Sequence, residues 1–124
     1  MAEAAQNIRD IVETTKAYYD GPADEIYRDI WGENVHIGYF EDPENEDLPT
    51  AMHRSNVKQA EPVNLQPGEL IHDVGCGYGA LARFLAKNYG TRVLATNISE
   101  KELEWGCVFF FNDTATTEIY TVKD

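Results

Sequence analysis

The sequence is poor in cysteine, in basic residues and in long apolar runs. Cysteine occurs only at Cys76 and Cys107, which does not indicate a disulfide framework. There are 10 Lys and Arg against 22 Asp and Glu, so the formal net charge is −12, and a surface of this sign repels the phosphates of nucleic acids. No apolar segment approaches membrane-spanning length, and residues 1–5 lack the basic and apolar regions of a signal peptide. We therefore expect a cytoplasmic protein that binds neither nucleic acid nor membranes.

The negative charge is concentrated in the first half of the chain. Residues 1–62 contain 14 acidic and 5 basic residues, whereas residues 63–124 contain 8 and 5. An acidic surface of this kind does not exclude a small cationic substrate. The acidic loop 41–47 lacks the glycine and the terminal glutamate of an EF-hand loop, and we predict no metal site. At 124 residues the chain forms one domain at most.

The stretch 69–79 is the centre of the sequence. An apolar run around Asp73 predicts a short buried strand, and three glycines within the next six residues predict a turn whose backbone a ligand can approach closely. A helix is predicted over residues 80–89, and its free N–H groups would point at whatever the turn holds. This arrangement is typical of a site for a nucleotide-type cofactor.

The spacing of the glycines leaves the cofactor open. Gly75, Gly77 and Ala80 satisfy the dinucleotide pattern, which would imply a nicotinamide- or flavin-dependent oxidoreductase. Asp73, however, precedes the first glycine by two residues, where a carboxylate suits a cationic ligand better than a pyrophosphate. The acidic ribose anchor expected about 20 residues after a dinucleotide turn is absent, and Asn97 stands near that place. A tight turn that binds no ligand is the remaining alternative.

The motif Asp-x-Gly-x-Gly-x-Gly at residues 73–79 resembles motif I of the class I S-adenosylmethionine-dependent methyltransferases. The resemblance implies S-adenosyl-L-methionine as cofactor, with the turn packed against it and Asp73 fixing its methionine part. It also implies that the end of the second strand lies at the ribose hydroxyls. The cofactor-binding residues implied in these two regions are Asp73, Gly75, Cys76, Gly77, Gly79, Asn97 and Ile98. His72 departs from the family's usual aliphatic residue and would need a hydrogen-bond partner in the sheet.

Two helices with apolar stripes are predicted before this motif, over residues 3–19 and 23–31, and a third over residues 48–61. Aromatic residues in the first two, together with the segment 30–40, resemble the N-terminal cap of the sarcosine/dimethylglycine methyltransferases. The likeness extends more distantly to phosphoethanolamine methyltransferases and cyclopropane synthases. It implies methyl transfer to a small amine in betaine biosynthesis, with Tyr19 as the catalytic residue and His36 and Ile37 along the cofactor. The alternatives are a carbon methyltransferase of the cyclopropane-synthase kind, a cap that is only a packed lid, and a His36 satisfied by neighbouring backbone.

A second strand is predicted over residues 92–97, followed by a helix that begins with the capping box Ser99 to Glu102. The predicted fold class is α/β, the N-terminal part of a Rossmann-like class I methyltransferase fold with a helical N-terminal cap, truncated after the second strand. From Cys107 the composition changes to aromatic and β-branched residues, which favour a strand, and residues 108–121 resemble a translated sequencing adaptor. We therefore expect a cap and lid over residues 1–62, the start of the cofactor-binding domain over 63–106, and a non-native tail over 107–124. A genuine β-hairpin strand is the alternative for that tail, and the fragment itself should be marginally stable and inactive.

Overall fold

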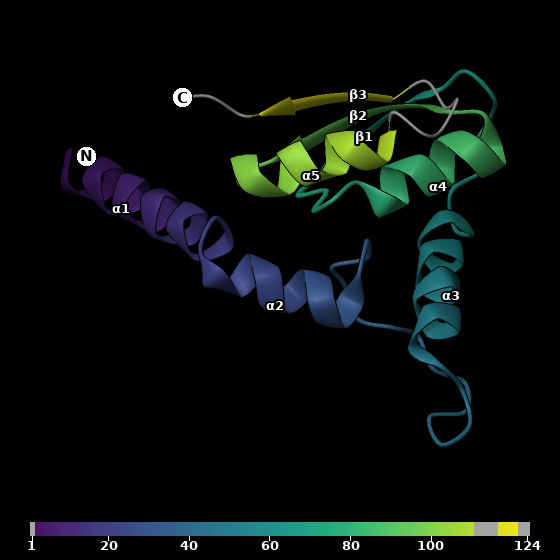
Figure 1. Cartoon of the computed structure of the whole chain (residues 1–124). Coiled ribbons are helices and arrows are strands. Elements are labelled where there is room, and N and C mark those ends of the chain that lie inside the picture. Colours follow the sequence, from purple (N-terminus) through teal and green to yellow (C-terminus); the bar gives the residue numbers. More distant parts are fainter. Residues whose placement is uncertain (1, 111–116, 122–124) are drawn as a thin grey trace.

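The computed structural model describes residues 2–110 and 117–121. Within these residues, three helices make up the first half, and three strands alternate with two further helices in the second half (Figure 1). In chain order they are α1 (Ala2–Tyr19), α2 (Pro22–Trp31), α3 (Leu48–Ala60), β1 (Leu70–Val74), α4 (Ala80–Tyr89), β2 (Arg92–Asn97), α5 (Glu100–Phe110) and β3 (Thr117–Thr121). The predicted fold class, an α/β Rossmann-like start behind a helical cap, is confirmed.

The sheet is parallel throughout, in the order β1-β2-β3. Leu70 is paired with Arg92 at the start of the first ladder, and Asn97 with Thr121 at the end of the second. Successive crossovers of one hand place their helices on one face of a sheet, and Figure 1 shows α4 and α5 on the same side of the strands. The carboxyl ends of β1 and β2 therefore meet at one edge, where the glycine turn begins.

The core lies between the sheet and α4. Val93 and Ala95 point from β2 into a cluster with Ala82, Leu85 and Ala86 of α4, and all five are buried. Small side chains on α4 let the helix approach the strands closely, so the turn that connects β1 to α4 is held firmly at both ends.

None of the described helices packs on the opposite face of the sheet (Figure 1). Leu70 and Val74 on that face keep 63% and 74% of their surface exposed, so the prediction of a buried first strand is wrong for these two residues. His72 points to the same side and finds its predicted partner there, because its Nε2 lies 3.0 Å from Thr96 Oγ1.

Local signals set the ends of the cap helices. Pro22 occupies the first turn of α2, and Gly32 ends that helix with a φ of 63° that favours glycine. Asp47 caps α3 by accepting the Thr50 N–H at 2.8 Å. Arg54 of α3 holds the acidic loop 41–47 in place by pairing with both Glu46 and Glu41.

The C-terminal part differs from the prediction in two respects. The helix that begins at Glu100 continues to Phe110 instead of ending near Gly106, so the β-propensity of residues 107–110 is overridden by the continuing helix. Residues 117–121 form a strand parallel to β2, which a hairpin cannot produce, and the sheet has three strands instead of two. The rest of the predicted tail, residues 111–116 and 122–124, lies outside the described residues. The assignment of 107–124 as non-native stays a prediction.

Candidate functional site

The glycine turn is fixed to the end of β2 by backbone hydrogen bonds. The N–H groups of Gly75 and Cys76 both donate to the Thr96 carbonyl, at 2.8 and 3.0 Å. Gly75, Gly77 and Gly79 have φ values of 75°, 54° and 76°, a region that side-chain-bearing residues enter only with strain. The turn thus presents bare backbone at the N-terminus of α4.

A cavity of about 170 Å³ lies over this turn. One wall comes from β1, the turn and α4, and the other comes from the segment after α2 and from α3. The lining residues are Glu33, Val35, His36, Gln59, Asp73, Val74, Gly75, Cys76, Gly77, Ala80 and Leu81. The structure thus brings together five of the predicted cofactor residues, namely His36, Asp73, Gly75, Cys76 and Gly77.

Asp73 gives this cavity its charge. Burial raises the pKa of its carboxyl group, and its Oδ2 atom is buried without a hydrogen-bond partner among residues 2–110 and 117–121. A desolvated carboxylate with an unpaired oxygen is stabilised by a cationic group. Burial also raises the pKa of the neighbouring Cys76 thiol to about 12, so that thiol stays protonated at neutral pH and is no nucleophile.

A second buried carboxylate stands beside the turn on α5. Asn97 Nδ2 donates to the Gly77 carbonyl at 3.3 Å and to Glu102 Oε2 at 2.6 Å, while Asn97 Oδ1 accepts the Ile98 N–H at 2.8 Å. Glu102 is 3% exposed, burial raises its pKa, and its Oε1 has no partner within the described part of the chain. Gly79, Asn97 and Ile98 do not line the cavity over the turn but support or adjoin it.

Glu102 was missed as a site residue by the sequence analysis. The capping-box pattern assigned its carboxylate to the start of α5, but only half of that box forms. The Glu102 N–H donates to Ser99 Oγ at 3.0 Å, whereas the carboxylate turns to Asn97. Asp20, directly after α1, accepts from Ser99 Oγ at 2.7 Å and from the Lys101 N–H at 3.3 Å. The only sequence signal for Glu102 was the presence of an acidic residue in the first turn of the helix that follows β2.

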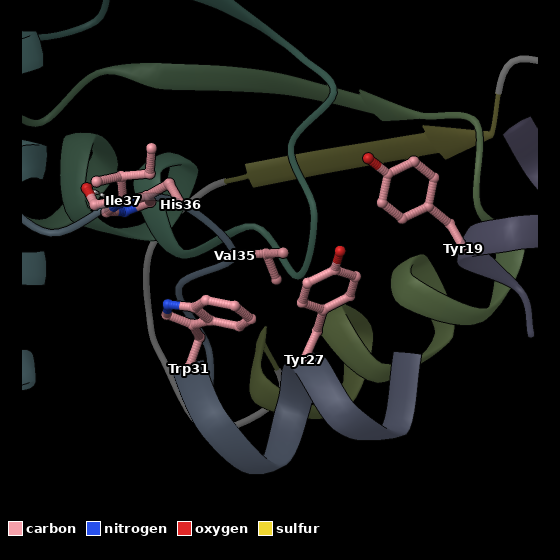
Figure 2. A pocket seen from close by; sticks show the side chains of 6 residues that line it. All are labelled: Tyr19, Tyr27, Trp31, Val35, His36 and Ile37. Carbon is pink, nitrogen blue, oxygen red and sulfur yellow. Dashed lines mark hydrogen bonds between the residues drawn. The ribbon is translucent and has the colours of Figure 1, made fainter. Parts of the chain in front are cut away.

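A second cavity of about 250 Å³ opens between the cap helices and the segment that follows them. Figure 2 shows the residues that line it, which are Tyr19, Tyr27, Trp31, Val35, His36 and Ile37. The ring centroids of Tyr27 and Trp31 are 5.2 Å apart, and those of Tyr19 and Tyr27 are 6.5 Å apart. Val35 and His36 line both cavities, so the aromatic cavity adjoins the one over the glycine turn.

The two tyrosines of the aromatic cavity differ in their hydroxyl groups. The Tyr27 hydroxyl lies 2.9 Å from that of Tyr18, and this hydrogen bond raises the pKa of Tyr27. The Tyr19 hydroxyl has no hydrogen bond to any residue that the structure describes, and Figure 2 shows it directed into the space beside Tyr27. Of the pair, Tyr19 therefore has the hydroxyl that is available to a ligand.

His36 is held by α3 while it lines both cavities. Its Nε2 lies 3.0 Å from Asn56 Oδ1, and its Nδ1 lies 3.2 Å from the Ile37 carbonyl. The Ile37 carbonyl also accepts from Ser55 Oγ at 2.7 Å. Each ring nitrogen of His36 thus faces an oxygen, and a neutral imidazole can donate to one of the two. One partner is neighbouring backbone and the other is a side chain of α3, while the ring also lines both cavities. Ile37 contributes to the aromatic cavity with a side chain that is 89% exposed.

The sequence model of the mycolic acid cyclopropane synthetase family matches residues 6–120. The chain belongs to this family. Its members are class I S-adenosylmethionine-dependent methyltransferases, so the dinucleotide alternative is excluded. The methyltransferase chain is 41% identical over 93 residues to a glycine/sarcosine/dimethylglycine N-methyltransferase from Actinopolyspora halophila, covering 73% of this chain and 16% of that protein. It is also 41% identical over 97 residues to a sarcosine/dimethylglycine N-methyltransferase from Halorhodospira halochloris, covering 75% and 34%.

A solved structure of a candidate sarcosine dimethylglycine methyltransferase from Galdieria sulphuraria superposes on the methyltransferase chain with a TM-score of 0.71 and 26% identity. The match covers 83% of this chain and 42% of that one. The chain thus spans about a third or less of the length of these two curated relatives. Within the described residues, no helix is both long and apolar enough to cross a membrane.

The site fits the cofactor of this family on two observations. Asp73, which lines the cavity, and Glu102, which Asn97 joins to the Gly77 carbonyl, each have a buried carboxylate oxygen without a hydrogen-bond partner in the described part of the chain. Such oxygens match a ligand that carries an ammonium group and neighbouring hydroxyl groups. A Cβ placed on Gly75 would meet nothing within 4 Å, and one placed on Gly77 would make only ordinary contact with Val35, at 3.5 Å from its Cβ. The backbone here is open to a bound group.

Proposed function

We propose that this chain is the N-terminal part of an enzyme that transfers the methyl group of S-adenosylmethionine to a small amine such as sarcosine or dimethylglycine. The observation that carries the proposal is the aromatic cavity that adjoins the cavity over the glycine turn and shares Val35 and His36 with it. The two N-methyltransferases that are 41% identical to the chain support the same substrate class.

The cofactor would be held by groups on both sides of the turn. Asp73 would pair with its ammonium group, and Glu102, fixed by Asn97 beside Ile98, would accept from ribose hydroxyls. The backbone of Gly75, Cys76, Gly77 and Gly79 would contact it at close range, as the left-handed turn allows. When bound, S-adenosylmethionine supplies a methyl group activated by its sulfonium.

The acceptor would occupy the aromatic cavity. A methylated glycine carries an ammonium group at neutral pH, and aromatic faces attract such cations by roughly 0.5–2 kcal/mol. Tyr27 and Trp31 present neighbouring rings at 5.2 Å, and Tyr19 completes the group from the end of α1. The fully methylated product keeps its positive charge, so the same rings would bind substrate and product.

Methyl transfer to an amine is an in-line displacement that needs no nucleophilic side chain. Alignment of the amine with the methyl group can supply up to roughly 7–11 kcal/mol of the barrier reduction. Tyr19, whose hydroxyl has no described partner, would orient the amine. The ammonium group must first lose its proton, to water or to a nearby carboxylate.

The test is methyl transfer from labelled S-adenosylmethionine by the full-length natural protein to sarcosine, dimethylglycine, phosphoethanolamine and unsaturated phospholipids. We expect label in sarcosine and dimethylglycine. Tyr19→Phe should lower turnover more than it weakens cofactor binding, whereas Tyr89→Phe, whose ring packs on Phe84 of α4 away from both cavities, should change neither. The 124-residue chain alone should be inactive, because its matches cover only 16% and 34% of the two curated relatives.

A carbon methyltransferase is the second candidate, because the matching family is named for cyclopropane synthesis. The same assay separates the two functions. Label that is found only in the phospholipids would establish the carbon methyltransferase and overturn the amine proposal.

A further inference from the structure

Tyr78 lies within the glycine turn, but its side chain leaves the turn and enters the cap. It is 1% exposed, and its hydroxyl donates to the carboxylate of Asp24 in the first turn of α2. The same hydroxyl lies 3.2 Å from the Asp24 carbonyl. A residue between two cofactor-turn glycines is therefore bound to the start of the cap helix that carries the aromatic cavity.

Asp24 is placed to hold this contact. It is fully buried, and its charge is compensated by Arg28 at 3.4 Å and by Lys101 of α5 at 3.3 Å. Burial, together with Asp24, raises the pKa of Tyr78, so the phenol keeps the proton that it donates. The contact joins three elements, namely α2, the turn and α5.

A second tie runs from the same residue to the other end of α2. The Tyr78 carbonyl accepts from Arg83 Nη1 at 2.7 Å, and Arg83 Nη2 pairs with Glu33 at 2.6 Å. Glu33 follows the helix end at Trp31 by two residues. Between the two ties, α2 presents Tyr27 and Trp31 to the aromatic cavity. The helix is thus attached to Tyr78 at both ends.

We propose that Tyr78 is a positioning residue that holds α2, and with it the aromatic cavity, in the correct position relative to the cofactor turn. This inference rests on the proposed function for its catalytic consequence. Misplacement of a reacting group by about 1 Å can lower turnover by roughly 100-fold. Loss of the hydroxyl would release the start of α2 while the glycines and Asp73, which contact the cofactor, keep their places.

The test compares Tyr78→Phe with Tyr89→Phe in the full-length natural protein. For Tyr78→Phe we expect kcat to fall about tenfold or more, with the Kd of S-adenosylhomocysteine within about threefold of the unmodified protein. Amide hydrogen exchange should become faster over residues 22–31 and stay unchanged over residues 48–60. Asp24→Asn keeps an oxygen that can accept from the phenol, so it should retain more turnover than Tyr78→Phe. Tyr89→Phe should match the unmodified protein in all measurements.

Unchanged exchange over residues 22–31 in Tyr78→Phe would overturn the inference. So would losses of kcat and of S-adenosylhomocysteine affinity in equal proportion, because they would indicate a general loss of folded protein. If Tyr78→Phe does not fold, Glu33→Ala removes the second tie alone, and unchanged exchange over residues 28–31 would be equally decisive. The exchange measurement needs no acceptor, so absence of label from every amine would refute the proposed function without deciding this inference.

Discussion

Gly77 offers the sharpest test of the cofactor site. Its φ of 54° lies in the left-handed region, where a residue with a Cβ costs roughly 1–2 kcal/mol. A Cβ at Gly77 would lie 3.5 Å from Val35 Cβ and 3.6 Å from Val35 Cγ2, which is ordinary contact. Alanine would therefore fit with backbone strain alone, whereas the two methyl groups of valine would enter the space between the turn and Val35, a residue that lines both cavities.

Gly68 provides the matched control. Its φ is 83°, a Cβ there would meet nothing within 4 Å, and the residue lines neither of the two cavities described here. Gly68→Ala and Gly77→Ala should each lower the free energy of unfolding by roughly 1–2 kcal/mol. Gly77→Val should in addition weaken S-adenosylmethionine binding by more than about tenfold, or ~1.4 kcal/mol.

The assay is calorimetric titration of the full-length protein and its variants with S-adenosylmethionine, with NAD as the control ligand, alongside urea unfolding. We expect no heat from NAD. A folded Gly77→Val variant that binds S-adenosylmethionine with unchanged affinity would refute the placement of the cofactor on this turn. An equal loss of affinity in Gly68→Ala would show that backbone strain, and not occupation of the cavity, causes the effect.

Three further predictions concern charge and the C-terminal segment. Asp73→Ala should weaken S-adenosylmethionine binding by about tenfold or more, since hydrogen bonds to charged groups contribute about 1.5–3 kcal/mol; unchanged affinity in calorimetry would contradict the role of the carboxylate. Arg54 lowers the pKa of Glu46 from 4.5 to about 2, so this pair stabilises the fold above about pH 4.5 and the contribution is lost as the pH falls towards 2. Urea unfolding should therefore show a steeper loss of stability in this range for the unmodified protein than for Glu46→Gln, and parallel curves would disprove it. Amplification across the Gly106 codon from genomic DNA should give a natural sequence that differs from residues 108–121, whereas a product that encodes the same residues would show that β3 is natural.

Local sequence signals were sufficient for most of the fold. The bounds of α4 and β2 agree with the prediction, and β1 lies where the apolar run around Asp73 predicted a strand. Gly90 at the end of α4 and the glycine turn before that helix need backbone conformations that few other residues adopt. The helices α1 and α2 were found from their apolar spacing, and Pro22 and Gly32 fix the bounds of α2. The cofactor turn was recognised for the same reason, since its chemistry depends on residues that are contiguous in the chain.

The C-terminal part was decided by tertiary structure. Residues 107–110 have the composition of a strand, yet they continue α5, and residues 117–121 join β2 in parallel. The strand propensity of a segment predicts its structure poorly where the chain needs a crossover helix before the next parallel strand begins.

The detailed site also depended on contacts that no local pattern encodes. Tyr78 meets Asp24 across 54 positions of sequence, and His36 meets Asn56 across 20. Glu102 followed a capping-box pattern, but folding placed its carboxylate against Asn97 and gave Ser99 Oγ an additional partner in Asp20. The sequence by itself determined where the chain turns and which backbone can approach a cofactor, because those properties are local. Only the tertiary structure decided which buried carboxylates lie beside that turn and which aromatic rings adjoin it, because burial and pairing arise when distant segments pack together.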